Sequence, residues 1–396
     1  GVYQIKNAGN LYWFAALVNG TLTDGTAQNL SANAVLVNDI TVNTDVLDAN
    51  GTLASDVSGF KVWTPIGDYY NKYTGKFDGQ SHTVSGLYFN DSQTDYVGLF
   101  GNNKNTIIQN VGVADSYFNG KNYVGGVCGY KEYGTISNCY NTGAVSGSFN
   151  NIGGVCGYNN GTVANCYNTG AVSGSNSSVG GVCGNNYGGV KNCYNTGAVI
   201  GASWYIGGVC GYLYGNIENC YSIGTVGGSS DESVGALCGY NDHRTISNCY
   251  FDSSKCNKNA VGKNDGTATN TEGKTAEQFA SGEVCYLLNN CKTDGTQAWY
   301  QDLTPETGDK HPVLKSNGNN TVYAGKPCMS QFSNTELASI NHSLDEHGFC
   351  TVCGGYQPAT DSNSDGVYEI SNAGQLYWFA ALVNGTLLDG TAQNLS

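Results

Sequence analysis

The chain has 396 residues, with 17 basic and 31 acidic side chains and a formal net charge of −14. So few basic side chains argue against nucleic-acid binding, because neutralising phosphates requires a basic face. No window approaches 18 consecutive apolar residues, so the sequence predicts no membrane span in this segment. The 57 glycines and 28 tyrosines are instead typical of a β-rich protein with many turns.

The first segment, residues 1–31, has the pattern of a capping helix. Asn7 is a suitable N-cap and Gly20 a suitable helix end. We expect this helix to cover the open end of a β structure, because an uncovered end leaves unpaired strand edges. Apolar side chains recur at the i, i+3, i+4 and i+7 positions of a helix, at Leu11, Phe14, Ala15 and Val18.

Residues 124–251 contain a tandem repeat with steps of 27 or 28 residues. Each row opens with a sequence such as Val-Gly-Gly-Val-Cys-Gly at 179–184 and continues with one such as Val-Lys-Asn-Cys-Tyr at 190–194. A sixth, degenerate row has Phe100 in place of the first cysteine, 28 residues before Cys128. A fixed period in this range indicates stacked structural units.

The composition of the rows predicts short strands. Each row is rich in Val, Ile, Tyr and Thr and is interrupted by glycine-containing turns. A period of about 27 residues accommodates about three strand-and-turn segments. Rows stacked in register about 4.8 Å apart would pair their backbone amides along one axis. The sequence therefore predicts an all-β fold, a right-handed parallel β-helix in which each coil contacts only its neighbours.

These patterns divide the chain into five parts. We expect the β-helix over residues 32–251, with its regular rows at 96–251. After residue 251 the pattern gives way to polar loop and short helical segments, one of them opened by a capping box at 275–278, and we interpret 252–325 as a C-terminal cap. Residues 326–365 form a small Cys/His-rich linker unit.

Residues 366–396 repeat residues 1–31 at an offset of 365, with four differences. A long-period repeat therefore encloses the short-period one. We expect a parent protein that joins 365-residue modules end to end, so that residues 366–396 are the start of the next copy.

The small linker unit contains a candidate metal site. Cys328, His342, Cys350 and Cys353 have the ligand types of a structural zinc site and include a CxxC pair. The long interval between Cys328 and His342 weakens the match, and a disulfide or an unbound CxxC pair is the alternative. One structural zinc is a hypothesis, and no other cofactor is expected.

Ten cysteines of the rows form two columns, a column being the residues at one position in successive coils. One interpretation is a disulfide within each coil, worth about 2–4 kcal/mol of stability. The other is that reduced cysteines serve as small apolar fillers of a tight core. A bulge at Asn138 and its equivalents would reverse which neighbour faces inward, so both interpretations stay open. The columns are Cys128, Cys156, Cys183, Cys210 and Cys238, and Cys139, Cys166, Cys193, Cys220 and Cys249.

Two further columns flank the second cysteines. Stacked asparagines can hydrogen-bond amide to amide along the axis, and stacked tyrosines can either form an exposed strip that binds glycans or only hold the coils in register. The columns are Asn138, Asn165, Asn192, Asn219 and Asn248, and Tyr140, Tyr167, Tyr194, Tyr221 and Tyr250.

The rows, and the Phe-Asp-Gly-Gln-Ser-His-Thr-Val-Ser-Gly-Leu-Tyr segment at 77–88 that precedes them, resemble the GLUG motif of bacterial secreted and surface proteins. The likeness extends over roughly residues 1–325. It implies an extracellular bacterial protein, often an adhesin-like or cell-wall-associated one, and a motif without catalytic residues. The first cysteine of each row is a departure, because the motif usually has an aliphatic residue there.

We therefore expect a non-enzymatic extracellular structural or adhesive protein, secreted or on a bacterial cell surface, whose modules form a stalk or filament. Its expected partners are neighbouring copies of the module and cell-wall or host glycans. The alternatives are a glycan-binding module and, third, a polysaccharide-active β-helix enzyme. The rows contain few ionisable residues, and the clusters at 231–232 and 242–244 are too sparse to name a catalytic acid and base.

Overall fold

The computed structural model describes residues 1–229, 233–314, 320–325, 331–336, 343–351, 355–362, 367–384 and 386–387. It contains two compact units, Gly1–Thr275 and Ala276–Ser396. Each unit is considered separately below.

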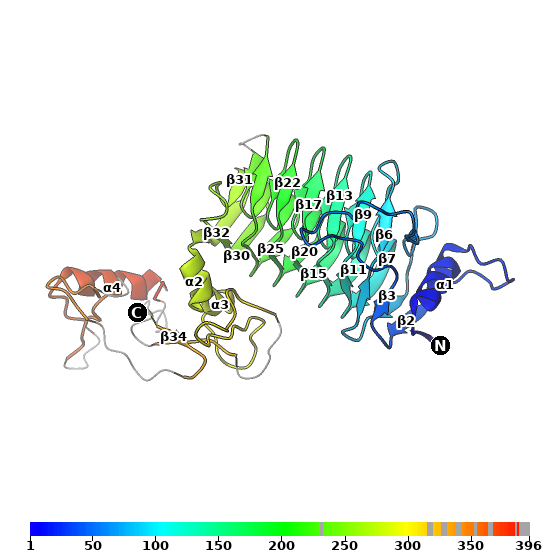
Figure 1. Cartoon of the computed structure of the whole chain (residues 1–396). Coiled ribbons are helices and arrows are strands. Elements are labelled where there is room, and N and C mark those ends of the chain that lie inside the picture. The colour runs from blue at the N-terminus through cyan, green and yellow to red at the C-terminus, as the bar shows by residue number, and fades with distance from the viewer. Residues whose placement is uncertain are drawn as a thin grey trace. The chain divides into compact units, whose positions relative to one another are not determined.

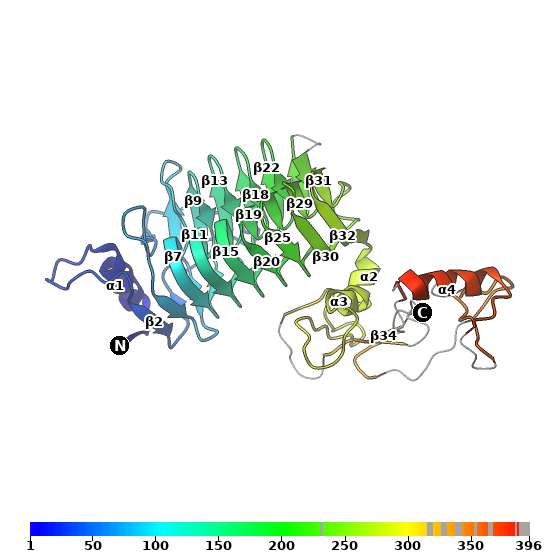
Figure 2. The same ribbon diagram turned by 180° about the vertical axis from the view of Figure 1, so that it is seen from behind.

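The first unit is a parallel β-solenoid, which confirms the predicted β-helix (Figure 1). Equivalent strands of successive coils lie side by side along one axis in both views (Figure 2). The register is that of the repeat: Cys156 pairs with Cys128 on one side and with Cys183 on the other. The degenerate row also stacks as predicted, because Phe100 pairs with Cys128.

Three parallel sheets run along the described part of the solenoid. The smallest consists of β10 (Val124–Gly125), β14 (Ile152–Gly153), β18 (Val179–Gly180), β23 (Ile206–Gly207) and β28 (Val234–Gly235). The second consists of β6 (Tyr88–Asn90), β9 (Tyr117–Gly120), β13 (Ala144–Gly147), β17 (Val172–Gly174), β22 (Val199–Gly201) and β27 (Val226–Gly228).

The third and largest sheet carries two strand segments in most coils. Its strands are β1 (Val2–Ile5), β2 (Asn33–Leu36), β3 (Ile40–Thr41), β4 (Lys76–Asp78), β5 (Thr83–Ser85), β7 (Phe100–Gln109), β8 (Gly112–Ala114), β11 (Cys128–Ser137), β12 (Tyr140–Asn141), β15 (Cys156–Ala164), β16 (Tyr167–Asn168), β19 (Cys183–Asn186), β20 (Gly189–Lys191), β21 (Tyr194–Asn195), β24 (Cys210–Leu213), β25 (Asn216–Glu218), β26 (Tyr221–Ser222), β29 (Cys238–Asn241), β30 (Thr245–Asp252), β31 (Val261–Asn264) and β32 (Thr267–Lys274).

The core is built from columns of aliphatic side chains, one from each coil. The residues in two such columns are at most 1% exposed, which explains why the repeat keeps Val, Ile or Leu at these positions. A single coil has no second layer to cover its apolar side chains, so the coils are stable only when stacked. The columns are Val127, Val155, Val182, Val209 and Leu237, and Ile136, Val163, Val190, Ile217 and Ile246.

The predicted N-terminal helix is present as α1 (Ala8–Asn19), with Asn7 as N-cap and Gly20 in the left-handed conformation at its end. Phe14 is fully buried and packs edge-on against Tyr73, with ring centroids 6.0 Å apart. The Asn19 amide donates to the Pro65 carbonyl and accepts from the Gly67 amide. Helix α1 therefore closes the hydrophobic core at the N-terminal end of the solenoid.

The solenoid continues past the expected end at residue 251. Strand β31 pairs with β29, and β32 pairs with β30 through Asp252 and Lys274. The sequence pattern missed these strands because β32 is almost wholly polar and exposed, so no apolar alternation marks it.

The second unit contains α2 (Ala276–Ala280), α3 (Glu283–Leu288), the antiparallel pair β33 (Tyr323–Ala324) and β34 (Phe332–Ser333), and α4 (Ala373–Asn384). Phe279, Val284 and Trp299 are buried here. Helix α4 has nearly the sequence of α1, as the long repeat predicts. In the described residues, no helix has the length and apolar run needed to cross a bilayer.

Candidate functional site

The outer asparagine column forms a continuous amide ladder. Its members adopt φ values of 51° to 54°, a left-handed conformation that Asn tolerates better than most residues. Asn165 donates to Asn138 at 3.2 Å and accepts from Asn192 at 3.0 Å, and the same contact links Asn138 to Asn110, Asn219 to Asn192 and Asn248 to Asn219. The left-handed turn at each asparagine changes the direction of the strand, and the cysteine that follows it is buried.

The tyrosine column stacks face to face, with ring centroids 4.8 to 5.0 Å apart from Tyr140 to Tyr221. Tyr194, Tyr221 and Tyr250 are buried, and Tyr140 is hydrogen-bonded through its hydroxyl to Thr83. Because the ring faces lie against one another, this column does not present the exposed strip that one hypothesis proposed. Its geometry fits the alternative, which is to hold the coils in register.

Both cysteine columns consist of free thiols that are fully buried. Those of the second column donate to the carbonyl two residues earlier, as Cys166 does to Ala164 at 3.2 Å. Cys166 also accepts from the backbone amide of Cys139 in the preceding coil. Burial raises the pKa of Cys139 and Cys183 far above the ordinary value of 9.0. The disulfide within each coil is therefore absent from this structure.

Two inner polar columns were not predicted. Asn141, Asn168 and Asn195 are fully buried and form an amide ladder of their own, at 2.9 and 2.8 Å. The sequence could have predicted this column, because an asparagine directly follows the column tyrosine in these three rows.

The second inner column consists of Asn103, Lys131, Asn159, Asn186, Leu213, Asn241 and Asn264. Lys131 is fully buried and its ammonium group donates to the carbonyl and hydroxyl of Thr106, both at 3.3 Å. Burial lowers the pKa of Lys131 below 10.5.

A second group of tyrosines, the tyrosine band, lies on the outer surface in continuous ring-to-ring contact. It comprises Tyr69, Tyr70, Tyr96, Tyr123, Tyr130, Tyr158, Tyr187, Tyr205, Tyr212, Tyr214 and Tyr240. The closest pair is Tyr130 and Tyr158, whose centroids are 4.6 Å apart at an interplanar angle of 3°. A signal for this band was present too, because tyrosine recurs two residues after the first cysteine in four rows.

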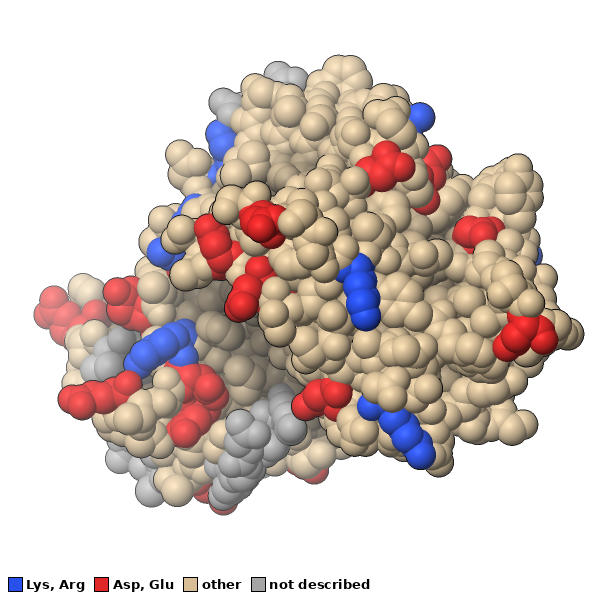
Figure 3. Space-filling model, turned by 45° about the vertical axis from the view of Figure 1, so that its right-hand side comes forward, with Lys and Arg blue, Asp and Glu red and all other residues tan. Residues whose placement is uncertain are grey.

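Charged side chains are sparse on the face of the molecule seen in Figure 3, and each sign is scattered among uncharged residues. Among the described residues no three His, Cys, Asp or Glu side chains gather as a metal site would require. Asp242 accepts from the Tyr212 hydroxyl and pairs with His243, so it is part of a small surface network. The acidic cluster at 231–232 lies outside the described residues.

The candidate zinc site cannot be assembled from the described residues. Cys328, His342 and Cys353 lie outside them, and Cys350 is described as a buried residue whose amide donates to the Gly355 carbonyl. The zinc hypothesis stays a prediction.

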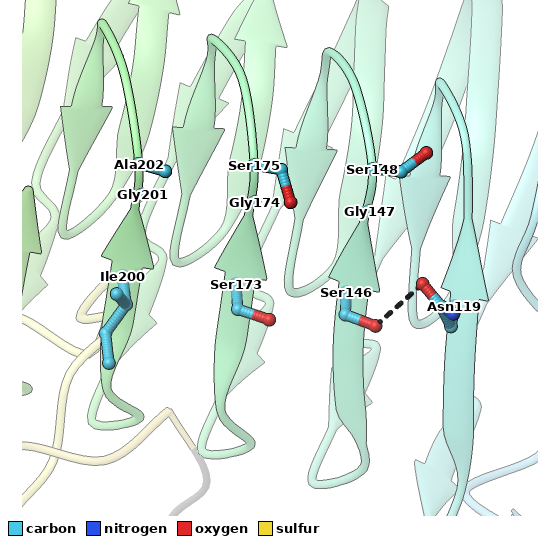
Figure 4. Close-up of a pocket in the computed structure, with 10 residues that line it drawn as sticks. All are labelled: Asn119, Ser146, Gly147, Ser148, Ser173, Gly174, Ser175, Ile200, Gly201 and Ala202. Atoms are coloured by element: carbon cyan, nitrogen blue, oxygen red, sulfur yellow. Dashed lines mark hydrogen bonds between the residues drawn. The ribbon is translucent and has the colours of Figure 1, made fainter. Parts of the chain in front are cut away.

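A shallow pocket of about 250 Å³ lies on the outer face of the second sheet (Figure 4). Four successive coils line it with equivalent residues, such as Ser146, Ser173 and Ile200, and Ser146 donates to Asn119. None of its ten lining residues has an ionisable side chain. The pocket therefore has no group of its own for acid–base catalysis.

The fold and these columns define a class: a parallel β-solenoid whose coils are locked in register by stacked side chains. The family description "The GLUG motif" matches residues 120–146 and 202–227, so the chain carries the GLUG motif that its rows predicted.

Two curated proteins are similar to parts of the chain. Halomucin of Haloquadratum walsbyi is 37% identical over 106 residues, which is 26% of this chain and 1% of halomucin. A "Putative Gly-rich membrane protein" of Evansella cellulosilytica is 31% identical over 80 residues, 19% of this chain and 9% of that protein. The chain thus spans only a small fraction of the length of these relatives.

One solved structure is also similar, that of a "putative immunoglobulin A1 protease" from Bacteroides ovatus. It matches with a TM-score of 0.55 at 22% identity, over 79% of this chain and 92% of that one. At this identity the likeness supports the β-solenoid fold alone.

Proposed function

We propose that this chain is a non-enzymatic structural segment of an extracellular surface protein, in which successive modules build a stalk. The main supporting observation is the asparagine ladder from Asn110 to Asn248, which joins six successive coils through side chains as well as backbone. Such a ladder adds side-chain hydrogen bonds to the contacts between neighbouring coils, which favours a stable rod.

The charge and the relatives support the same proposal. A net charge of −14 with few basic residues favours solubility at high local density over adhesion to phosphate-bearing polymers. Halomucin and a protein named for a membrane are similar to this chain over short segments, which fits a repeated element of long surface proteins. The near-identity of α1 and α4 supports the proposal that a second module begins at residue 366.

Electron microscopy of matched one-module and two-module proteins tests the stalk. The one-module protein is residues 1–396, and the two-module protein places residues 1–365 before it. We expect single rods, with the two-module particle about twice as long and in line. Two solenoids joined at widely varying angles would contradict the proposal.

A protease is the second candidate, favoured by the name of the structural neighbour. Incubation of the purified chain with immunoglobulin A1 and with acidic polysaccharides tests it. We expect no fragments, and time-dependent cleavage would replace the structural proposal with an enzymatic one.

A further inference from the structure

The two ends of the tyrosine band differ in their contacts with cationic side chains. At the C-terminal end of the band, two cationic side chains of the chain itself lie over tyrosine rings. The Lys263 ammonium lies over the Tyr240 ring at 4.5 Å from its centroid and 3.4 Å from the Asp265 carboxylate. The Tyr240 hydroxyl donates to the same carboxylate at 2.8 Å. The Arg244 guanidinium lies 4.2 Å from the centroid of Tyr214. A ring face and a carboxylate thus hold one ammonium group between them.

The N-terminal end has the same two components. The Tyr96 and Tyr123 rings stack at 5.0 Å, and Asp95 and Asn122, which directly precede them in the sequence, are hydrogen-bonded to each other. The pKa of Tyr96 is raised by burial, then by Tyr123 and then by the Asp95 carboxylate. Asp95 accepts from the backbone and side-chain amides of Asn122 at 3.1 and 2.9 Å, which fixes its position.

This end is also open to solvent. Tyr69 is 60% exposed and Tyr70 is 86% exposed. Their rings meet at 90° with centroids 5.0 Å apart, and Tyr69 contacts Tyr96 at 6.0 Å. Large aromatic side chains left this exposed are typical of an interaction site.

No cation of the described chain occupies this end. Among the described residues, neither Asp95 nor Asp68 has an ion-pair partner. Of the lysines in the adjoining segments, Lys72 and Lys104 pair with Glu132 at 2.7 and 2.8 Å. Lys121, whose backbone amide donates to the Thr94 carbonyl, forms no ion pair within the described part of the chain. The N-terminal end therefore has the ring and carboxylate of the other end without the ammonium group.

We propose that the surface formed by Tyr69, Tyr70, Tyr96 and Asp95 binds a lysine side chain presented by a partner protein. The ring faces attract any cation. The carboxylate additionally accepts hydrogen bonds from a cation that has N–H groups, as the lysine side chain does. A quaternary ammonium group lacks such donors. The net charge of −14 further favours a basic partner.

Titration of the full 396-residue chain, carrying fluorinated tyrosine, tests this proposal by NMR. The probe is Nα-acetyl-lysine methylamide, with Nα-acetyl-norleucine methylamide as the uncharged control of matched length. Tyr→Phe variants at positions 69, 70, 96, 158 and 187 assign the signals. We expect saturable shifts of the Tyr69, Tyr70 and Tyr96 signals with the lysine probe and none with the norleucine probe.

Variants then separate the two components. Asp95→Asn keeps an acceptor for the Asn122 amides and removes the charge, and Tyr70→Ala removes an exposed ring. Each should weaken binding roughly threefold. Phe149→Ala, at an exposed aromatic outside the band, should change nothing.

Three results would overturn the proposal. One is the absence of saturable shifts, and another is equal affinity in Asp95→Asn and the parent chain. The third is tetramethylammonium binding as tightly as the lysine probe, because hydrogen bonds from the lysine N–H groups to the carboxylate would then add nothing. Unchanged fluorine signals of Tyr158 and Tyr187 show that each variant retains its fold.

Discussion

Lys131 pairs in register with Asn159 of the next coil, so a fully buried amine stands in a column where its neighbours are asparagines. Asn159 donates to Asn186 at 2.7 Å, but Lys131 has no amide acceptor to continue that ladder. Burying an amine costs free energy that its hydrogen bonds to Thr106 only partly offset.

Replacing this lysine should stabilise the fold at neutral pH. Lys131→Asn removes the buried amine and extends the ladder to Asn159, so we expect about 1–2 kcal/mol of added stability at pH 7. Urea unfolding measures it, with the exposed Lys61→Asn as control. A loss of stability in Lys131→Asn would show that the contacts of the buried amine contribute more free energy than its burial costs.

The pH dependence of this gain follows from the lowered pKa of Lys131. Between that pKa and 10.5 the unfolded chain binds more protons than the folded chain, so stability rises with pH across this window. The advantage of Lys131→Asn should therefore be largest below the window and shrink towards pH 10.5. Taking the difference between the two proteins at each pH removes the contribution of the cysteines other than Cys128, Cys139 and Cys156, whose charges interact with Lys131. An advantage that does not change with pH would contradict the assignment of the effect to the amine.

The outer asparagine ladder should depend on both the backbone and the amide. Asn165→Ala loses two amide hydrogen bonds and places an alanine at a φ of 53°, so we expect a loss of about 2–3 kcal/mol. Asn165→Gly loses the same bonds without the strain and should cost about 1 kcal/mol. Thermal and urea unfolding compare the pair. Equal losses would mean that the left-handed conformation contributes nothing.

Two adjacent glycines should respond in opposite ways. A Cβ on Gly188 would collide with the backbone of Gly161 in the preceding coil, whereas a Cβ on Gly189 would meet no atom within 4 Å. Gly188→Ala should therefore cost about 2–4 kcal/mol, because stacked backbones cannot move apart without breaking the ladder. Gly189→Ala should be neutral or stabilise by about 0.5 kcal/mol. Similar values for the two variants would indicate that the coils are less closely packed.

The ten column cysteines should resist alkylation in the reduced native chain. All ten are fully buried, so an alkylating reagent cannot reach them, and burial also raises the pKa of Cys139, Cys183 and Cys210. Mass spectrometry after iodoacetamide treatment at pH 8 should find the ten unmodified until urea unfolds the protein. For the thiols whose folded pKa is raised, such as Cys139, Cys183 and Cys210, the contribution to stability should fall as pH rises past the unfolded value of 9.0. Modification of the native chain would contradict this packing.

If the chain is refolded with an oxidised low-molecular-weight disulfide, we expect cross-links between coils within one column, such as Cys128 with Cys156. In-register parallel strands place these Cα atoms about 4.8 Å apart, inside the range of about 4.4–6.8 Å that disulfides span. Chymotrypsin cleaves after Tyr130, Tyr140 and Phe149, which places Cys128, Cys139 and Cys156 on separate peptides, so non-reducing peptide mapping distinguishes this pair from Cys128 with Cys139. Cross-links within coils would restore the interpretation that the sequence allowed.

The sequence by itself determined the stacking of this protein. The repeat period set the coil length, the alignment of rows predicted which residues pair, and Asn7 and Gly20 predicted the ends of α1. These features are local or periodic, so they can be recognised without knowing where the chain goes in space.

Which residues of each coil face outward could be determined only from the tertiary structure. The left-handed turn at Asn138 and its equivalents bends the strand, which buries Cys139 and lays the Tyr140 column against itself. The tyrosine band, the buried Lys131 and the final strands β31 and β32 likewise become evident only once the coils are stacked. Exposure is a property of several coils together, because a single coil has neither an inside nor an outside until its neighbours cover it.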